Sequence, residues 1–228
     1  DSRLRTSAMV EVGDKRIVID AGPDFRQQML RTNARRIDAI LLTHEHKDHT
    51  GGLDDVRAFN FVDYPTIRPV DIYATARTIT TIRKDFDYAF MENKYICAPE
   101  MRLHEIDTEK PFCVKGVEIV PINGKHSDRF TVTGYRIGRL AYLTDFKQIE
   151  QSEVEKLKGV DTLVVNALRF REHHSHFNVE EALSLVEQLK PRQTLLTHLS
   201  HDIGLHAETN PTLPEGVRLG YDTLTVEI

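Results

Sequence analysis

Cysteine is scarce in this chain, and the scarcity excludes several kinds of site. The 228 residues include only Cys97 and Cys113, whose spacing matches neither a metal-binding nor a redox motif. Both thiols are therefore expected to be buried or idle, as in a reducing compartment. A cytoplasmic protein is the default expectation.

Long apolar runs and linkers are also absent. No apolar run approaches the roughly 20 residues that a bilayer-spanning helix needs, and residues 1–5 lack the apolar core of a signal peptide. The sequence contains no internal repeat, low-complexity tract or Gly/Ser-rich linker. We therefore expect a single domain over residues 1–228, with no membrane partner.

Positive charge is not in excess either. The formal net charge is −5, whereas the phosphates of nucleic acids favour surfaces rich in Lys and Arg. The basic stretch at residues 31–36 has no second stretch to join, and we interpret it as a solvated helix end. No large nucleic acid is therefore expected as a partner.

What is present is a series of short, β-branched runs separated by helical patterns. The clearest helix covers residues 179–190, with Asn178 as its N-cap and Pro191 after its end. A second helix is predicted at 151–158, ended by Gly159. Strands follow one another early and alternate with helices late, which favours an α/β fold of two mixed sheets with outer helices. The predicted strands cover residues 16–20, 39–43, 70–74, 117–122, 130–137, 140–144, 162–166 and 194–197.

Polar residues that can bind metal directly follow four of these apolar strands. They are Asp20, His44, Asp145 and His198. The strand ends of a layered α/β protein converge on one rim, where side chains can be held rigidly. A single case would be an ordinary loop residue in water, but four together predict a site.

The densest group of candidate ligands lies at residues 44–49. In extended backbone, His44, His46 and Asp48 would lie on one side, and a turn after Lys47 would bring Asp48 and His49 toward a second, nearby point. The glycines at 51–52 would then let the chain turn tightly into the next helix. Imidazole with carboxylate is the ligand set expected for Zn²⁺ or Mn²⁺, and the lack of nearby cysteine disfavours a purely structural zinc.

The run His44-x-His46-x-Asp48-His49 resembles the signature of metallo-β-lactamase-fold hydrolases. Asp20, in Ile19-Asp20-Ala21-Gly22, matches an aspartate that precedes this run in such proteins. The resemblance extends from about residue 16 to the C-terminus. It implies a four-layer αββα sandwich with metals at one edge, between the sheets. The further ligands that it implies are His126, Asp145 and His198.

The resemblance implies two divalent ions per chain, Zn²⁺ or Mn²⁺. One would be held by His44, His46 and His126, the other by Asp48, His49 and His198, and Asp145 would bridge them. Asp20 would orient a ligand histidine, and Asp48 also counts among the catalytic residues. Two such ions about 3.5–4 Å apart can share a hydroxide for a displacement reaction. Aspartate at position 145 is typical of phosphodiesterases and thioesterases of the fold.

Three local matches resemble the phosphoribosyl cyclic phosphodiesterases of phosphonate breakdown. This resemblance implies a small cyclic phosphodiester as the substrate and places that family's extra active-site histidine at His176. An imidazole with a pKa near neutrality could protonate the departing ribose oxygen. The alternative is a solvated polar loop, the interpretation that we prefer for His173 and His174. The matches are residues 123–127 with 133–135, residues 176–178, and residues 196–201 with 213–216 and 220–222.

The resemblance fails at the start of the chain. Members of that family commonly begin with a Gly-Thr-Gly strand and a Cys-rich segment that holds a structural zinc, completed by a histidine aligned with His201. This chain lacks that beginning, so we expect that a first strand is either omitted here or dispensed with. His201 is a candidate ligand for a structural metal, with a hydrogen-bonded loop histidine as the alternative.

Other functions are compatible with parts of the same pattern. A tRNA 3′-processing endonuclease would use the same ligands but carries a long Gly- and Pro-rich arm, which is absent between His49 and His198. A thioester or lactone hydrolase of glyoxalase type would act on an acyl carbon with the same metals. A metal store or an inactive binding protein is disfavoured because competent ligands occupy all seven ligand positions. The oligomeric state stays open, a homodimer being the commonest assembly.

Overall fold

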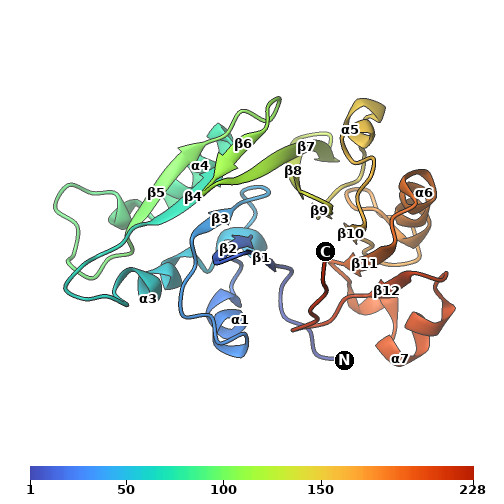
Figure 1. Ribbon diagram of the computed structural model, residues 1–228, viewed down its shortest axis with the longest axis horizontal. Coiled ribbons are helices and arrows are strands. Elements are labelled where there is room, and N and C mark those ends of the chain that lie inside the picture. The colour runs from blue at the N-terminus through green and yellow to red at the C-terminus, as the bar shows by residue number, and fades with distance from the viewer. The chain divides into compact units, whose positions relative to one another are not determined.

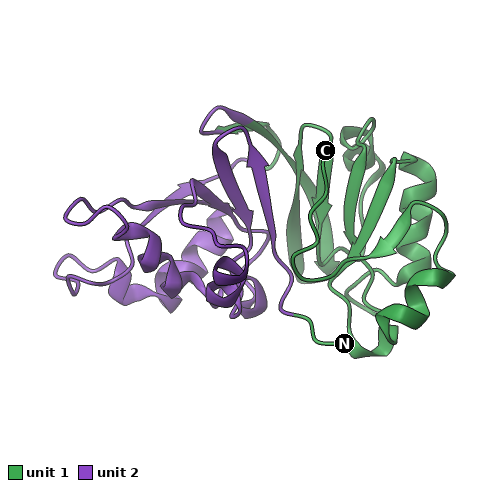
Figure 2. Cartoon of the chain, turned by 60° about the horizontal axis from the view of Figure 1, so that its bottom comes forward, with its two compact units in different colours: residues 1–3, 108–113, 118–228 green, residues 4–107, 114–117 purple.

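The computed structural model describes residues 1–228, which divide into two compact units (Figure 2). Unit 2 contains residues 4–107 and 114–117, and unit 1 contains residues 1–3, 108–113 and 118–228. The expectation of a single domain stays a prediction. None of the helices is both long and apolar enough to span a membrane.

Unit 2 is built on a five-stranded sheet with the order β1-β2-β3-β4-β5 (Figure 1). Strand β1 pairs antiparallel with β2, and the other pairs are parallel. The strands are β1 (Ala8–Val12), β2 (Lys15–Ile19), β3 (Ala39–Leu41), β4 (Val70–Ala74) and β5 (Met101–Glu105). The helices are α1 (Phe25–Arg31), α2 (Lys47–Thr50), α3 (Arg57–Asn60) and α4 (Ala76–Asp85), with the 3-10 turns η1 (Leu53–Val56) and η2 (Asp87–Ala89).

The core of unit 2 explains why the last three residues of β2 and all of β3 are apolar. Every residue of β3 is fully buried, as is usual for parallel strands. Side chains from the helices complete this core: Phe25 of α1, Leu53 of η1 and Ile82 of α4 are buried with Ile40 and Ile72 of the sheet. The buried strands thereby fix the positions of the loops that follow them.

The seven-stranded sheet has the order β12-β11-β10-β9-β8-β7-β6 and lies in unit 1 apart from the end residues Val114 and Val117. Strands β7, β8 and β9 pair antiparallel, and β9 to β12 are parallel. The strands are β6 (Phe112–Val114), β7 (Val117–Ser127), β8 (Phe130–Ile137), β9 (Leu140–Leu143), β10 (Thr162–Asn166), β11 (Gln193–Thr197) and β12 (Val217–Leu219). The helices are α5 (Gln151–Lys156), α6 (Val179–Leu189) and α7 (His206–Thr209), with the 3-10 turns η3 (His201–Ile203) and η4 (Asn210–Thr212).

Helix α6 begins where the sequence predicts. The Asn178 side chain accepts from the Glu181 amide, and the Glu181 carboxylate accepts from the Asn178 amide, each at 2.8 Å. This reciprocal capping box satisfies two donors that the first turn would otherwise leave unpaired. Ala182 and Leu185 of α6 pack into the unit 1 core with Leu163 of β10.

Candidate metal centre

Unit 2 gathers three histidine rings of the predicted motif after the end of β3. Nε2 of His44 lies 2.9 Å from Nδ1 of His46, and these two rings meet edge to face at 4.5 Å. The His44 ring also lies 4.4 Å from the ring of His49. His44 and His49 are each only 1% exposed. Together with Asp48, these histidines form what we call the N-terminal cluster.

The path of the motif differs from the prediction by one residue. His46 has extended backbone, with φ −62° and ψ 147°, but helix α2 begins directly after it. The amides of His49 and Thr50 both donate to the His46 carbonyl, at 3.0 and 3.1 Å. The chain therefore turns one residue earlier than predicted, at Lys47, and Asp48 lies in the helical turn and not in the extended stretch. Its carboxylate still lies 3.5 Å from Nε2 of His49.

Asp20 supports the N-terminal cluster from a fully buried position after β2. Oδ1 accepts from the Thr43 amide at 2.9 Å, and Oδ2 accepts from the Thr43 hydroxyl at 2.9 Å. Nδ1 of His49 lies 2.6 Å from Oδ2 of Asp20. A hydrogen bond at Nδ1 leaves Nε2 of His49 as the ring's ligand atom. This is the contact expected of an aspartate that orients a ligand histidine.

Two glycines allow the loops after β2 and α2 to touch. A Cβ atom on Gly22 would lie 2.1 Å from the Asp48 carbonyl oxygen, and one on Gly52 would lie 2.1 Å from the Gly22 carbonyl oxygen. The Ala21 amide donates to the His49 carbonyl, and the Gly52 amide donates to the Ala21 carbonyl, both at 2.8 Å. Gly52 has φ −98°, which any residue can adopt. Close contact, and not the predicted tight turn, therefore requires glycine there.

Unit 1 gathers four more of the predicted residues around one carboxylate oxygen. Oδ1 of Asp145 lies 2.9 Å from Nε2 of His176 and 3.2 Å from Nε2 of His198. Nε2 of His126 lies 4.0 Å from the same oxygen. Asp145 and His126 are buried, at 2% and 5% exposed. We call these four residues the C-terminal cluster.

Left-handed backbone occurs after three of the strands that lead to the two clusters. Asp20 after β2, Asp145 after β9 and His198 after β11 have φ values of 64°, 62° and 52°. This region costs a non-glycine residue energy, although Asp and His adopt it more readily than most. His126 is placed by a different device, a register shift in β7 between Lys125 and Ser127. Such a bulge redirects a side chain out of the regular alternation.

The C-terminal cluster is also fixed by contacts outside the candidate ligands. Nδ1 of His126 donates to the Ser175 carbonyl at 2.7 Å, so that Nε2 is left to bind metal. The Thr144 hydroxyl donates to Oδ2 of Asp145 at 2.7 Å, so Oδ1 is the oxygen that faces the histidines. These contacts give two ligand side chains a defined orientation.

His176 lies within the C-terminal cluster. The Ser175 hydroxyl is 3.0 Å from Nδ1 of His176, and Nδ1 of His173 is 3.1 Å from the same atom. Burial lowers the pKa of His176, and the bond to Asp145 opposes this shift only in part. Burial and the neighbouring His176 also lower the pKa of His173 to about 4. His173 is a half-buried loop residue whose Nδ1 lies 3.2 Å from the Ser175 hydroxyl, whereas His174 is exposed.

His201 stands apart from both clusters. Its side chain is 95% exposed, and Nε2 lies 3.4 Å from Oδ1 of Asp202. A structural metal normally holds its ligands in a closed, four-coordinate site. This exposure favours the alternative of a loop histidine for His201.

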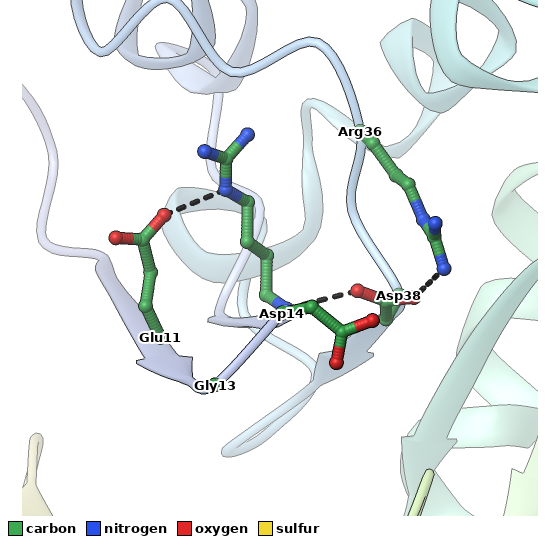
Figure 3. Close-up of a pocket in the computed structure, with 6 residues that line it drawn as sticks. Glu11, Gly13, Asp14, Arg36 and Asp38 are labelled. Atoms are coloured by element: carbon green, nitrogen blue, oxygen red, sulfur yellow. Dashed lines mark hydrogen bonds and ion pairs between the residues drawn. The ribbon is translucent and has the colours of Figure 1, made fainter.

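A charged pocket in unit 2 lies at the opposite ends of β2 and β3 from the N-terminal cluster (Figure 3). Nε of Arg16 lies 2.6 Å from Oε1 of Glu11, and the Arg36 guanidinium lies 2.6 Å from Oδ1 of Asp38. Oδ2 of Asp38 accepts from the Arg16 amide at 2.9 Å. Because these charges satisfy one another, the pocket supports the β1–β2 hairpin and offers no catalytic group.

The donor atoms of both clusters suit a divalent metal ion. In unit 1, ligand atoms of His126, Asp145 and His176 all lie within 4.8 Å of one another. In unit 2, two imidazole nitrogens face each other at 2.9 Å. Imidazole and carboxylate ligands are the usual set for Zn²⁺ and also suit Mn²⁺.

Residues 15–199 match the family model described as the beta-lactamase superfamily domain, and the chain therefore belongs to that superfamily. The predicted metallo-β-lactamase fold and metal-dependent hydrolase class are confirmed.

Among solved structures, the chain is similar to a new diphosphatase from the PhnP family. The two share 38% sequence identity with a TM-score of 0.89, over 97% of this chain and 83% of that one. The predicted likeness to the phosphodiesterases of phosphonate breakdown is thereby supported at the level of the family. A second structure, Zn²⁺-bound PqqB from Methylobacterium extorquens, has 17% identity and a TM-score of 0.75 over 99% of this chain and 88% of that one. That likeness concerns the fold alone.

A curated relative is named octanoyltransferase and comes from Porphyromonas gingivalis (strain ATCC BAA-308 / W83). It is 40% identical over 226 residues, which cover 98% of this chain. The chain spans only 45% of that relative's length.

Proposed function

We propose that the chain is a binuclear metal-dependent phosphodiesterase that acts on a small, cyclic phosphodiester. The observation that carries the proposal is the C-terminal cluster, in which one oxygen of Asp145 faces three imidazoles at 2.9 to 4.0 Å. An aspartate at this point suits a ligand shared between two cations, since a carboxylate has two oxygens and a full negative charge. The likeness to a PhnP-family diphosphatase supports phosphate chemistry.

The family resemblance implies two ions per chain, Zn²⁺ or Mn²⁺. His44, His46 and His126 would hold one ion, and Asp48, His49 and His198 the other, with Asp145 shared. When bound, such ions supply a nucleophile at neutral pH and stabilise negative charge on the phosphoryl oxygens.

The remaining residues would orient these ligands and move a proton. Asp20 fixes His49 through Nδ1, and the Ser175 carbonyl fixes His126 in the same way. Burial lowers the pKa of His176 and so favours its neutral form. A histidine here can accept, at the ring nitrogen that carries no hydrogen, the proton released when water attacks phosphorus, and can give a proton to the departing ribose oxygen.

The test pairs metal content with turnover of bis(p-nitrophenyl) phosphate and then of a cyclic ribose phosphate. His176→Ala should keep its metal content and lose about 100-fold to 10,000-fold in kcat, the usual contribution of a general acid or base. His174→Ala is the matched control, because His174 is exposed in the same segment. Unchanged turnover in His176→Ala would remove the proposed proton carrier. A wild-type protein that binds neither Zn²⁺ nor Mn²⁺ would overturn the proposal as a whole.

A second candidate function is hydrolysis of a thioester. The observation that favours it is the 40% identity to a longer protein named octanoyltransferase. An octanoyl group is transferred when a nucleophile attacks its activated acyl carbon. The same metals could activate water for attack on that carbon. An octanoyl thioester assayed beside the cyclic phosphodiester distinguishes the two functions by their ratio of kcat/KM.

A further inference from the structure

Two residues of the motif that are not candidate ligands are held by the two ends of one helix. Glu45 and Lys47 alternate with His44, His46 and Asp48 along the chain. Oε1 of Glu45 lies 2.6 Å from Nε of Arg77, in the first turn of α4. Nζ of Lys47 lies 2.5 Å from Oδ2 of Asp85, the last residue of α4.

The two contacts differ in their exposure to solvent. The Glu45 side chain is only 11% exposed, whereas Arg77 is about half exposed. The Lys47 contact is more open, but its ammonium also lies 5.4 Å from the centre of the Phe86 ring. A cation over an aromatic face is attracted by the ring. Each ion pair is therefore reinforced, one by partial burial and the other by an aromatic ring. An isolated surface ion pair without such support contributes little to stability.

Helix α4 is a firm support for these contacts. Thr78 and Ile82 are each 1% exposed, and Ile82 belongs to the unit 2 core. The Thr75 side chain caps the helix by accepting from the Thr78 amide. A helix of ten residues spans about 15 Å, and the long side chains of Arg77 and Lys47 allow its ends to reach two residues that are close in sequence.

The charges of Arg77 and Asp85 oppose what the helix alone prefers. The amino end of a helix carries partial positive charge and its carboxyl end partial negative charge. Arg77 places a cation near the first end, and Asp85 places an anion at the last residue. Helix stability therefore does not account for these two charges, whereas their contacts with Glu45 and Lys47 do.

We propose that α4 is a clamp that holds the metal-binding loop in its ligating conformation. Arg77 and Asp85 are positioning residues that act through Glu45 and Lys47 on His44, His46 and Asp48. The proposal rests on the proposed function only in that these three residues bind metal. A ligand set held in place before metal arrives loses less conformational freedom on binding and has a higher affinity.

Substitutions that remove a charge distinguish positioning from a direct electrostatic effect, because the two predict opposite changes in Zn²⁺ affinity. Lys47→Met and Arg77→Met each remove a positive charge near a cation site, so a purely electrostatic effect would raise the affinity for Zn²⁺. The clamp predicts the opposite, a loss of about tenfold in each variant, at the lower end of the effect of residues that support ligands. Lys84→Met is the matched control, because it removes the same charge from the exposed side of α4.

The measurements are Zn²⁺ affinity by chelator competition, thermal unfolding of the metal-free proteins, and amide hydrogen exchange. The amides of Thr50 and Gly51, which bond to the carbonyls of His46 and Lys47 at 3.1 and 2.8 Å, should exchange faster in both metal-free variants. Lys47→Arg and Arg77→Lys, which keep the ion pairs, should recover most of the lost affinity. Unchanged or tighter Zn²⁺ binding by both Met variants overturns the clamp. If wild-type protein binds no metal, the proposed function fails instead.

Discussion

Removal of the Asp20 carboxylate should destabilise the metal-free protein by about 3–5 kcal/mol. In Asp20→Ala the Thr43 amide and Nδ1 of His49 lose their acceptor, and both lie in a region where water does not replace it, since Thr43, His49 and Asp20 are at most 1% exposed. A buried donor left unsatisfied costs about 1–3 kcal/mol. The left-handed backbone at position 20, with φ 64°, adds to the loss because alanine adopts it less readily than aspartate.

The assay is urea unfolding of the metal-free protein, followed by circular dichroism at several pH values near 7. Asp24→Ala is the control, because its carboxylate accepts from the Arg5 amide at an exposed position, where water can take its place. A loss below about 1 kcal/mol in Asp20→Ala would refute the reasoning, since it would mean that both donors find new partners.

A second substitution at Asp20 separates its effect on stability from its effect on ligand orientation. Asp20→Asn keeps the size and an acceptor oxygen but replaces the second oxygen by a donor, which cannot accept from Nδ1 of His49. It should lose less stability than Asp20→Ala and still lose about 10–100-fold in Zn²⁺ affinity. Equal affinity in Asp20→Asn and wild type would remove Asp20 from the metal site.

Two further predictions concern groups outside the candidate ligands. Burial raises the pKa of Asp71, but hydrogen bonds from Lys115 and His104 outweigh it, so that the folded pKa lies below the ordinary value. Asp71 therefore stabilises the fold above its unfolded pKa of about 4. This contribution disappears as the pH falls through the folded pKa. The unfolding free energy of Asp71→Asn should therefore fall less steeply with decreasing pH than that of the wild type. Gly124→Ala would place a Cβ atom 2.2 Å from the buried Phe146 ring. This clash should lower the unfolding free energy, measured with urea, by about 1–3 kcal/mol, and it should reduce turnover by moving the adjacent Asp145. Wild-type stability in this variant would contradict the packing argument.

Buried strands and the residues after them could be predicted from the sequence. The predicted bounds of β4, β8 and β10 agree with the structure, since each is a short run rich in β-branched or aromatic residues with few competing signals. The residues after β2, β9 and β11 were identified because a polar side chain directly after an apolar run is easily seen.

Helix α4 could not be predicted in this way. Its sequence, Ala-Arg-Thr-Ile-Thr-Thr-Ile-Arg-Lys-Asp, is rich in β-branched residues, which favour strands. It forms a helix because Thr75 caps it and because Ile79 and Ile82 pack on the unit 2 core. The Thr75 and Thr78 pair was the signal that could have been read, as a polar N-cap before apolar residues spaced three apart.

Gly124, near His126, shows that a motif can be recognised in a sequence although the contacts that require it cannot. Asn123-Gly124-Lys125-His126 was a local match, but its physical reason lies in contacts distant in sequence. The Phe146 ring occupies the space where a Gly124 side chain would stand. Phe146 is in turn held by Asn166, whose side chain accepts from its amide and donates to its carbonyl. Such a network is visible only once the chain is folded.

Some departures from local preference occur at the two clusters and at the helix that contacts the motif, although Asn33, Lys115, Lys190 and Thr223 also have left-handed backbone. Asp20, Asp145 and His198 have left-handed backbone, and Arg77 and Asp85 carry charges that their helix alone disfavours. A chain selected only for stability would avoid these features, since each costs energy that must be offset elsewhere. Each is offset here by a specific contact of a candidate ligand or of the loop that carries it. At Asp20, Asp145 and His198, left-handed backbone and the ligand motif therefore coincide, and the contacts of these side chains account for the conformation.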